Sequence, residues 1–312
     1  MRKVYFSHDE ILQRPNKRYF APDPFQIHYH FRPARPANLC VTRDKETGAV
    51  NVSAGTIGPL TWEPYTMCLH VNISGSPHTY NNIEVGSHCV IALPGRDLVA
   101  ETWYTALPLL RGIDEMEVAG LHPSPSKWID IPGVAECPVN FECVAEFKHD
   151  YYTHGIIFLR VLGASLDEKV LSMSREEVVH WFPTYEVDDV ENIYGGSVKR
   201  LGIMGELFEC PTFPVGGKKG WYTGFNAWII DLADEGYITH DTQRKILGLV
   251  TEYNALLEKP QSERYKALKR FFTDLPIAII KGEWEKINEL INAIEKKQKK
   301  EQKKEAENFL TT

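Results

Sequence analysis

The sequence lacks the motifs that mark the best-known cofactor and catalytic sites. It has no GxGxxG after an apolar run, so it gives no support for a Rossmann dinucleotide site. It has no HExxH and no GxSxG, which removes the obvious metalloprotease and serine hydrolase motifs. The segment 216–220 (GGKKG) lacks the leading glycine and the Ser/Thr of a phosphate-binding loop, and it predicts only a flexible loop.

Long apolar runs and concentrated basic charge are also missing. No apolar run approaches the ~20 residues that span a bilayer, and residues 1–10 lack the apolar core of a signal peptide. We therefore expect a cytoplasmic protein with no membrane partner. The formal net charge of −7 argues against nucleic acid as a partner, because phosphate binding needs a basic surface. The Lys-rich run 295–305 predicts a solvated helix end.

Metal-binding patterns are scarce. The six cysteines form no CxxC pair, and several stand inside apolar runs such as 88–93, so we expect reduced, core-packed thiols. His28 and His30 lie on one face of an extended segment, but no third ligand stands nearby. The sequence predicts no metal site.

Three regions differ in character. Residues 1–36 are rich in proline, arginine and aromatic residues, which predicts an irregular N-terminal arm. Residues 37–223 contain short strand-like runs separated by turn signals, typical of a β-barrel or sandwich. Residues 224–312 carry apolar residues at helical spacing and predict an α-helical C-terminal extension.

The strand signals are clearest at four places. Residues 38–42 lead into a hairpin-type turn at 44–48, and residues 66–73 alternate, with Met67, Leu69, Val71 and Ile73 on one face. Residues 141–147 alternate in the same way, and 156–162 form a more fully apolar run. These runs predict antiparallel strands.

Helix signals fall into two groups. Two short helices are predicted among the strands, one from Thr79 to Val85 with the Thr79 hydroxyl as its N-cap, the other from Leu98 to Leu107. In the C-terminal region we expect helices over 239–257, 262–272 and 284–308. The first of these carries an apolar stripe of Ile246, Leu249, Val250, Tyr253 and Leu257.

Two uncharged segments are the candidates for chemistry. Residues 51–56 (NVSAGT) and 77–83 (PHTYNNI) read as turn-like stretches of small residues, hydroxyls and carboxamides. Small residues let a backbone approach a flat ring and donate N–H groups to its carbonyl oxygens. A threonine at a helix start offers a hydroxyl and N–H groups to a phosphate.

The order of these and later segments resembles the flavin reductase-like, FMN-binding split-barrel family. The resemblance runs from about Asn38 to Phe213. It is carried by segments in a fixed order: 40–42, 51–57, 61–64, 78–90, 132–138, 141–143, 154–161 and 194–196. It implies a split β-barrel with short helices, followed here by the helical extension.

The resemblance also implies a cofactor site. Asn51, Ser53, Ala54, Gly55 and Thr56 would line the flavin ring and ribityl chain of FMN. Thr79 and Asn82 would hold the phosphate. Where the family often has a basic residue before the threonine, this chain has Pro77 and His78, so His78, Arg43 or Arg96 would have to meet the phosphate charge.

Its implications for the reaction are less specific. His154 matches a histidine that can lie near the nicotinamide, and no catalytic side chain is assigned, because hydride transfer needs no general base. The resemblance implies a homodimer with FMN at its interface, where residues 194–196 and 199–200 of one subunit could reach the flavin of the other.

Three functions stay open. The first is an NAD(P)H-dependent flavin reductase-like oxidoreductase that uses NADH or NADPH and passes electrons to free flavin or a redox protein. The second is a non-catalytic, flavoredoxin-like FMN electron carrier. The third is a flavin-free binding or assembly protein on the same fold, which the missing basic residue before Thr79 favours and the intact 51–56 segment opposes.

Overall fold

The computed structural model describes residues 35–73, 77–107, 109–152, 154–174 and 224–310. Between residues 174 and 224 it describes only the short stretches 177–178, 181, 184–185, 190–191, 197–198, 200–203 and 206–209. Several predicted features lie outside the described residues. They are the N-terminal arm up to residue 34, the HxH pair at 28 and 30, and the segments 194–196 and 216–220.

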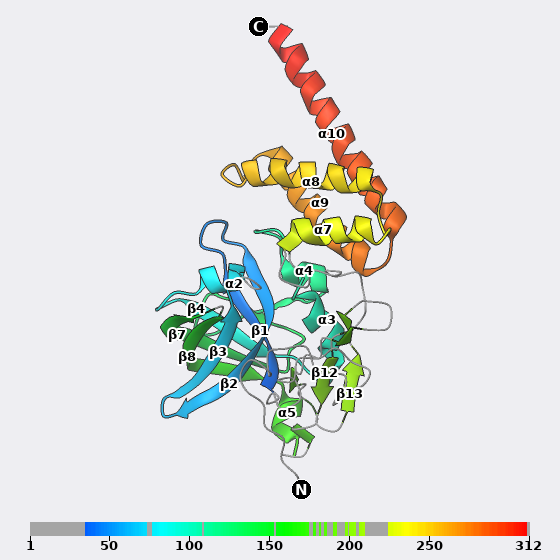
Figure 1. The fold of residues 1–312 in the computed structure, drawn as a ribbon. Coiled ribbons are helices and arrows are strands. Elements are labelled where there is room, and N and C mark those ends of the chain that lie inside the picture. Colours follow the sequence, from blue (N-terminus) through cyan, green and yellow to red (C-terminus); the bar gives the residue numbers. More distant parts are fainter. Residues whose placement is uncertain are drawn as a thin grey trace.

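The centre of the molecule is a closed, six-stranded antiparallel barrel, which confirms the predicted fold (Figure 1). Around the barrel the strands run in the order β1, β2, β3, β8, β7, β4, and pairing between β4 and β1 closes it. Their bounds are β1 Arg35–Arg43, β2 Val50–Trp62, β3 Tyr65–Asn72, β4 His88–Leu93, β7 Val139–Tyr151 and β8 His154–Leu166. Beyond β1 the sheet continues through short strands, β9 Thr184–Tyr185, β12 Arg200–Ile203 and β13 Glu206–Glu209.

Alternating apolar residues build the barrel interior. Met67, Leu69 and Val71 of β3 are buried there together with Ile157 and Leu159 of β8. Because side chains of a strand alternate between two faces, the predicted period of two places these residues inside. Three cysteines, Cys40, Cys89 and Cys143, are core members of the same interior cluster.

The structure corrects the interpretation of residues 51–56 as a turn. They lie inside β2, paired with β1 over seven positions from Val50↔Arg43 to Thr56↔Ala37. The chain reverses earlier, at 44–48, where the Asp44 carboxylate accepts hydrogen bonds from the backbone N–H groups of Glu46 and Thr47. A turn closed there leaves the small residues to continue as a strand.

The first short helix also differs from the prediction. α2 spans Pro77–Asn82, so it begins two residues before Thr79. Thr79 therefore does not cap it, and its hydroxyl donates to the Asn51 side chain instead. Lys148 of β7 donates to the carbonyl oxygens of Tyr80 and Ile83, and this contact accounts for the end of the helix short of Val85.

A second layer covers the outside of β4, β1 and β2. It contains the 3-10 helix η2 Arg96–Leu98, α3 Val99–Tyr104, α4 Glu115–Ala119 and the small pair β5 Pro123–Ser124 and β6 Gly133–Val134. The helix expected over 98–107 is thus split and ends at Tyr104. Leu98, Met116, Leu121 and Ile131 of this layer pack on Leu39, Val41 and Val52 of the barrel.

The C-terminal extension is helical, as expected. It comprises α7 Gly224–Asp234, α8 His240–Ala255, α9 Glu263–Ile280 and α10 Trp284–Leu310, and α10 projects beyond the others (Figure 1). The predicted stripe is buried on α8 at Ile246, Leu249, Val250 and Tyr253, while its last member, Leu257, lies two residues past the end of α8 and is partly buried. α9 continues eight residues past the expected end at Phe272, because Pro276 is accommodated inside it. Two further short elements are α5 Glu168–Ser172 and the pair β10 Val190–Glu191 and β11 Ser197–Val198.

The extension is joined to the barrel layer by one segment, residues 107–121. Leu107, Leu109, Ile113 and Val118 belong to the helical core. Met116, Ala119 and Leu121 belong to the core between this layer and the barrel. The surface that the amphipathic helices need is therefore provided by each other and by this segment of the same chain.

Candidate functional site

The β1–β2 hairpin carries a row of polar and small residues on its inner face. Across the two strands, Asn38 faces Gly55, Cys40 faces Ser53, and Thr42 faces Asn51. Asn38 is completely buried, and both polar atoms of its amide lack a hydrogen-bond partner. An unsatisfied buried amide costs about 1–3 kcal/mol, so this row is a costly feature to keep in a core.

The first half of β2 has an open edge. Pairing with β3 begins only at Thr56↔His70, and no described strand pairs with residues 50–55 on the side away from β1. The Val52 N–H points to this side, because it donates to the Glu115 carboxylate at 3.2 Å. Successive residues of a strand point their N–H groups in opposite directions, so the backbone of Ala54 faces the open edge as well.

Small side chains flank this edge. Ser53, Ala54 and Gly55 are all half-buried. A planar ring with carbonyl and imide groups could lie there, because Ala54 offers one N–H and one C=O with no bulky neighbour in sequence. On this side the residues present fit the ring of a flavin.

On the far side of the opening, β3 and β8 end together. Asn72 pairs with His154, two residues past the last β2–β3 pair that involves His70. His154 is exposed at the start of β8.

Asn51 is the centre of a buried hydrogen-bond network. Its side-chain oxygen accepts from the hydroxyls of Thr42 at 3.2 Å and Thr79 at 3.0 Å. Asn82 in turn donates its amide N–H to the Thr42 hydroxyl at 3.1 Å. The network ties α2 to the hairpin and brings Asn51, Thr79 and Asn82 together, although they are distant in sequence.

Glu115 completes this network from α4. Its carboxylate accepts from the Asn51 amide at 2.6 Å and from the Val52 N–H. The side chain is almost fully buried, and this burial raises the pKa of Glu115 to about 8. The hydrogen bonds from Val52 and Asn51 oppose the rise without cancelling it.

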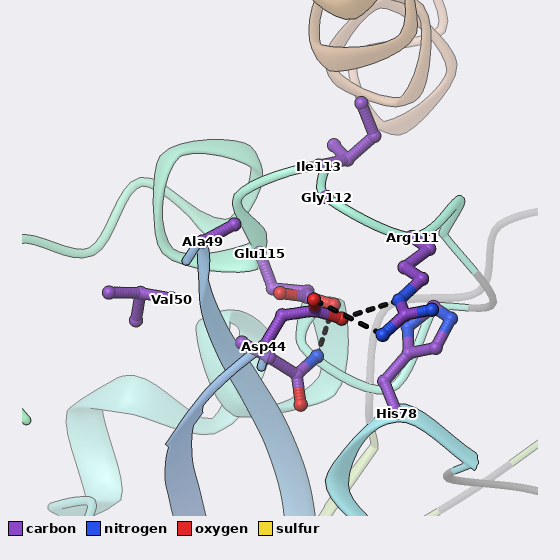
Figure 2. Close-up of a pocket in the computed structure, with 9 residues that line it drawn as sticks. Asp44, Ala49, Val50, His78, Arg111, Gly112, Ile113 and Glu115 are labelled. Atoms are coloured by element: carbon purple, nitrogen blue, oxygen red, sulfur yellow. Dashed lines mark hydrogen bonds and ion pairs between the residues drawn. The ribbon is translucent and has the colours of Figure 1, made fainter. Parts of the chain in front are cut away.

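A small hollow lies beside the network, with a volume of about 190 Å³ that includes space open to solvent. Figure 2 shows Arg111 reaching into it between Asp44 and His78, while Ile113 points away toward the helices. Arg111 donates to Asp44 at 2.5 and 3.2 Å and to Glu46 at 2.7 Å. The part of it that can hold the centre of a water molecule is only about 10 Å³, so the hollow by itself could hold no flavin ring.

Two titratable groups that line the hollow, Asp44 and His78, have shifted pKa values. Burial raises the pKa of Asp44, but hydrogen bonds from Arg111 and from the backbone of Thr47 and Glu46 outweigh it and lower the pKa to about 2. Burial, and then the Arg111 charge, lower the pKa of His78. At neutral pH the imidazole is therefore uncharged, while Asp44 and Arg111 form an ion pair.

The predicted cofactor-binding residues thus lie in three places. Ser53, Ala54 and Gly55 line the open edge, while Asn51, Thr56, Thr79 and Asn82 are buried. His78 lines the hollow. Arg43, one alternative for the phosphate charge, donates to the carbonyl oxygens of Gly48 and Asp130 instead.

Two residues of the site, Glu115 and Arg111, were not predicted from the sequence. Glu115 stands among Asp114 and Glu117, a pattern typical of a solvated surface. The alternation of apolar residues around it, at Ile113, Met116 and Val118, is the signal that could have indicated a buried segment. Nothing in the sequence near Arg111 pointed to Asp44.

Within the part of the chain that the structure describes, no group of three or more His, Cys, Asp or Glu side chains is arranged to hold a metal ion. None of the described helices combines the length and the apolar character that a membrane span requires.

Comparison with known proteins identifies the central region. Residues 31–185 match the family model described as flavin reductase like domain. This region is a flavin reductase like domain. The match covers β1 to β9, and with them the hairpin, α2 and the Glu115 segment. Membership supports a flavin-related oxidoreductase role.

One curated relative and two solved structures show the same likeness. The chain is 26% identical over 171 residues to the uncharacterized protein YwrF of Bacillus subtilis (strain 168), covering 52% of this chain and 82% of that protein. Nitrilotriacetate monooxygenase component B from Bacillus cereus matches with 17% identity and a TM-score of 0.48, over 68% of this chain and 98% of the other. Flavoredoxin of Desulfovibrio vulgaris (Miyazaki F) matches with 18% identity and a TM-score of 0.42, over 58% and 90%.

Proposed function

We propose that this protein binds FMN along the open edge of β2 and acts as an NAD(P)H-dependent flavin reductase-like oxidoreductase. The observation that carries the proposal is the edge itself, where Ala54 faces outward between the half-buried Ser53 and Gly55. This edge lies inside the flavin reductase like domain.

The chain's residues would place the ligand rather than perform the chemistry. Ala54 would hold the polar edge of the ring, and Asn51, fixed by Glu115, would keep α2 against the hairpin. A bound flavin supplies the redox chemistry by accepting a hydride from a reduced nicotinamide. His154, exposed beside the opening, would orient that nicotinamide.

A homodimer belongs to the proposal through the family resemblance. The open edge of β2 lies at the surface of one chain, and a second chain could cover a ring bound there. Electrons would pass to free flavin or to a redox protein. Light scattering of the flavin-loaded protein tests the dimer, and a monomeric mass at micromolar concentration would contradict it.

The function is tested by spectroscopy. FMN added to the purified protein should give a shifted flavin absorbance spectrum and quenched fluorescence. Anaerobic mixing with NADH or NADPH should then bleach the flavin band within seconds. A protein that binds FMN without being bleached would be a carrier, and one that ignores FMN would have the third, flavin-free function.

A substitution locates the site. Ala54→Pro removes the outward N–H without removing a ladder hydrogen bond, so FMN binding should weaken about tenfold or more while the fold persists. Gly58→Ala is the matched control, because it lies in the same strand and its added Cβ meets no atom within 4 Å. Equal FMN affinity in both variants, with both folded by circular dichroism, would place the ligand elsewhere.

A further inference from the structure

We infer that flavin recognition here rests on the ring, and that the terminal phosphate adds little to it, so the protein binds riboflavin about as tightly as FMN. The inference rests on the proposed function and concerns the same site. It follows from what the structure places at α2 and beside it, where the resemblance puts the phosphate at Thr79 and Asn82.

The two side-chain donors expected at the phosphate are already used within the protein. The Thr79 hydroxyl is buried and donates to Asn51, and the Asn82 amide is buried and donates to Thr42. Pro77, the first residue of α2, has no N–H to offer. A phosphate would have to break this network to gain either side chain, at the cost of leaving Asn51 or Thr42 unsatisfied.

The charge around the hollow also disfavours a dianion. Arg111 is bound by two carboxylates, Asp44 and Glu46, so these three groups carry a net charge of −1. Glu115 adds no positive charge in either protonation state, and His78 is held in its neutral form. A phosphate placed here would meet an ion cluster that is already satisfied and negative.

The nearby cations, two lysines and Arg43, also interact with groups of the protein. Lys148 is bound to the carbonyl oxygens of α2 and lies 3.4 Å from the Glu84 carboxylate. Lys45 lies 3.9 Å from the same carboxylate. Arg43 donates through its two terminal nitrogens to backbone carbonyl oxygens, while its Nε is buried without a hydrogen-bond partner. Of these three cations, both lysines therefore lie beside a carboxylate, and Arg43 is held by carbonyl oxygens.

The ring side has no such obstacle. Ser53, Ala54 and Gly55 are uncharged and half-buried, and the edge of β2 there is open. Interactions with this edge are common to riboflavin and FMN, because the two flavins differ only in the phosphate. Affinity for the two should therefore be similar.

The test is a pair of titrations on the full-length protein. Dissociation constants of riboflavin and FMN are measured by flavin fluorescence quenching at low and moderate salt. The inference expects the two constants to agree within about fivefold at both salt concentrations, since an exposed charge contributes little. FMN binding that is tighter by about 100-fold or more would overturn the inference and leave the proposed function standing. Failure to bind either flavin would overturn both.

A charge variant sharpens the test. Asp44→Asn removes one of the two carboxylates bound to Arg111 and keeps the oxygen that accepts the hydrogen bonds of the turn. The affinity for FMN should therefore rise severalfold, while the affinity for riboflavin stays unchanged. Glu117→Gln is the matched control, because it also removes one negative charge beside an arginine, Arg270 at 2.7 Å, and Glu117 does not line the hollow. An Asp44→Asn protein whose FMN-to-riboflavin ratio equals that of the control would contradict the inference.

Discussion

Glu115 combines burial, two hydrogen bonds to β2 and a raised pKa in one side chain. A buried carboxylate is expensive when ionised, so the protein keeps it in a setting where the neutral acid is favoured up to about pH 8. It holds Asn51, and Asn51 holds Thr79. A residue that touches no proposed ligand atom thus determines where α2 lies.

The pH dependence of stability follows from this side chain. Its pKa is 4.5 in the unfolded chain and about 8 in the folded protein, so folding favours the protonated form. The contribution is fully present below about pH 4.5 and is lost as the pH rises through about 8. Glu115→Gln should therefore cost about 1–2 kcal/mol near pH 5.5. The cost should vanish and then reverse as the pH approaches 9, because the wild-type protein loses stability over this range and glutamine does not titrate.

Urea unfolding of both proteins at pH 5.5, 7 and 9 measures this difference. Glu117→Gln, on the same helix but half-exposed, is the control and should show no such trend. A destabilisation by Glu115→Gln that is constant over the pH range would show that Glu115 does not titrate as its burial requires.

At the scale of elements, residues 107–121 connect two cores. Tyr253 of α8 donates its hydroxyl to the Arg111 carbonyl at 2.9 Å, and Gly112 follows with a φ of +82°. A Cβ on Gly112 would lie 3.2 Å from that Tyr253 oxygen. The helices therefore hold the segment that brings both Arg111 and Glu115 to the site.

Substitution of Gly112 tests this connection. Gly112→Ala should destabilise the protein by about 2–3 kcal/mol, because a strained φ is combined with a close contact. Gly120→Ala shares a positive φ, +75°, but its Cβ would meet no atom within 4 Å, so it should cost about 1 kcal/mol. Gly112→Ala should also weaken flavin binding, whereas Gly120→Ala should not. Equal effects of the two variants on both measurements would mean that contact with Tyr253 is unimportant.

The elements also show which features could be predicted from the sequence and which could not. The strand over residues 66–73 could be predicted, because burial of Met67, Leu69 and Val71 follows from the period of two. Residues 51–56 were wrongly interpreted as a turn, because small polar residues favour turns locally and pairing with β1 overrides that preference. The burial of Glu115 depends on three elements that are distant in sequence.

At the scale of the whole molecule, the helical extension and the barrel share buried residues. Leu107, Leu109, Ile113 and Val118 leave the barrel layer and pack among α7, α8 and α9. Removing the helices would expose these four side chains. A fully buried aliphatic side chain contributes about 1.5–3 kcal/mol, so the loss would be large compared with ordinary domain stability.

We therefore expect residues 35–310 to unfold in a single transition. Far-UV circular dichroism, dominated by the helices, and bound-flavin fluorescence, which reports on the barrel, should give the same urea midpoint. Ile113→Ala should lower both midpoints together. Two separated transitions, or a midpoint shift confined to the helical signal, would show that the proposed boundary near residue 224 separates independent units.

The strand-rich centre, the helical C-terminal region and the family resemblance could be predicted from the amino-acid sequence, because they depend on local periodicity and on the order of short segments. The sequence also placed Ser53, Ala54 and Gly55 among the candidate residues. Which of the candidate residues remain accessible to a ligand depends on the packing of distant segments. The tertiary structure buries Thr79 and Asn82 in a network with Asn51, and it pairs Arg111 with Asp44 and Glu46. Burial and charge pairing arise from contacts between segments that are distant in sequence, so they cannot be predicted from local sequence.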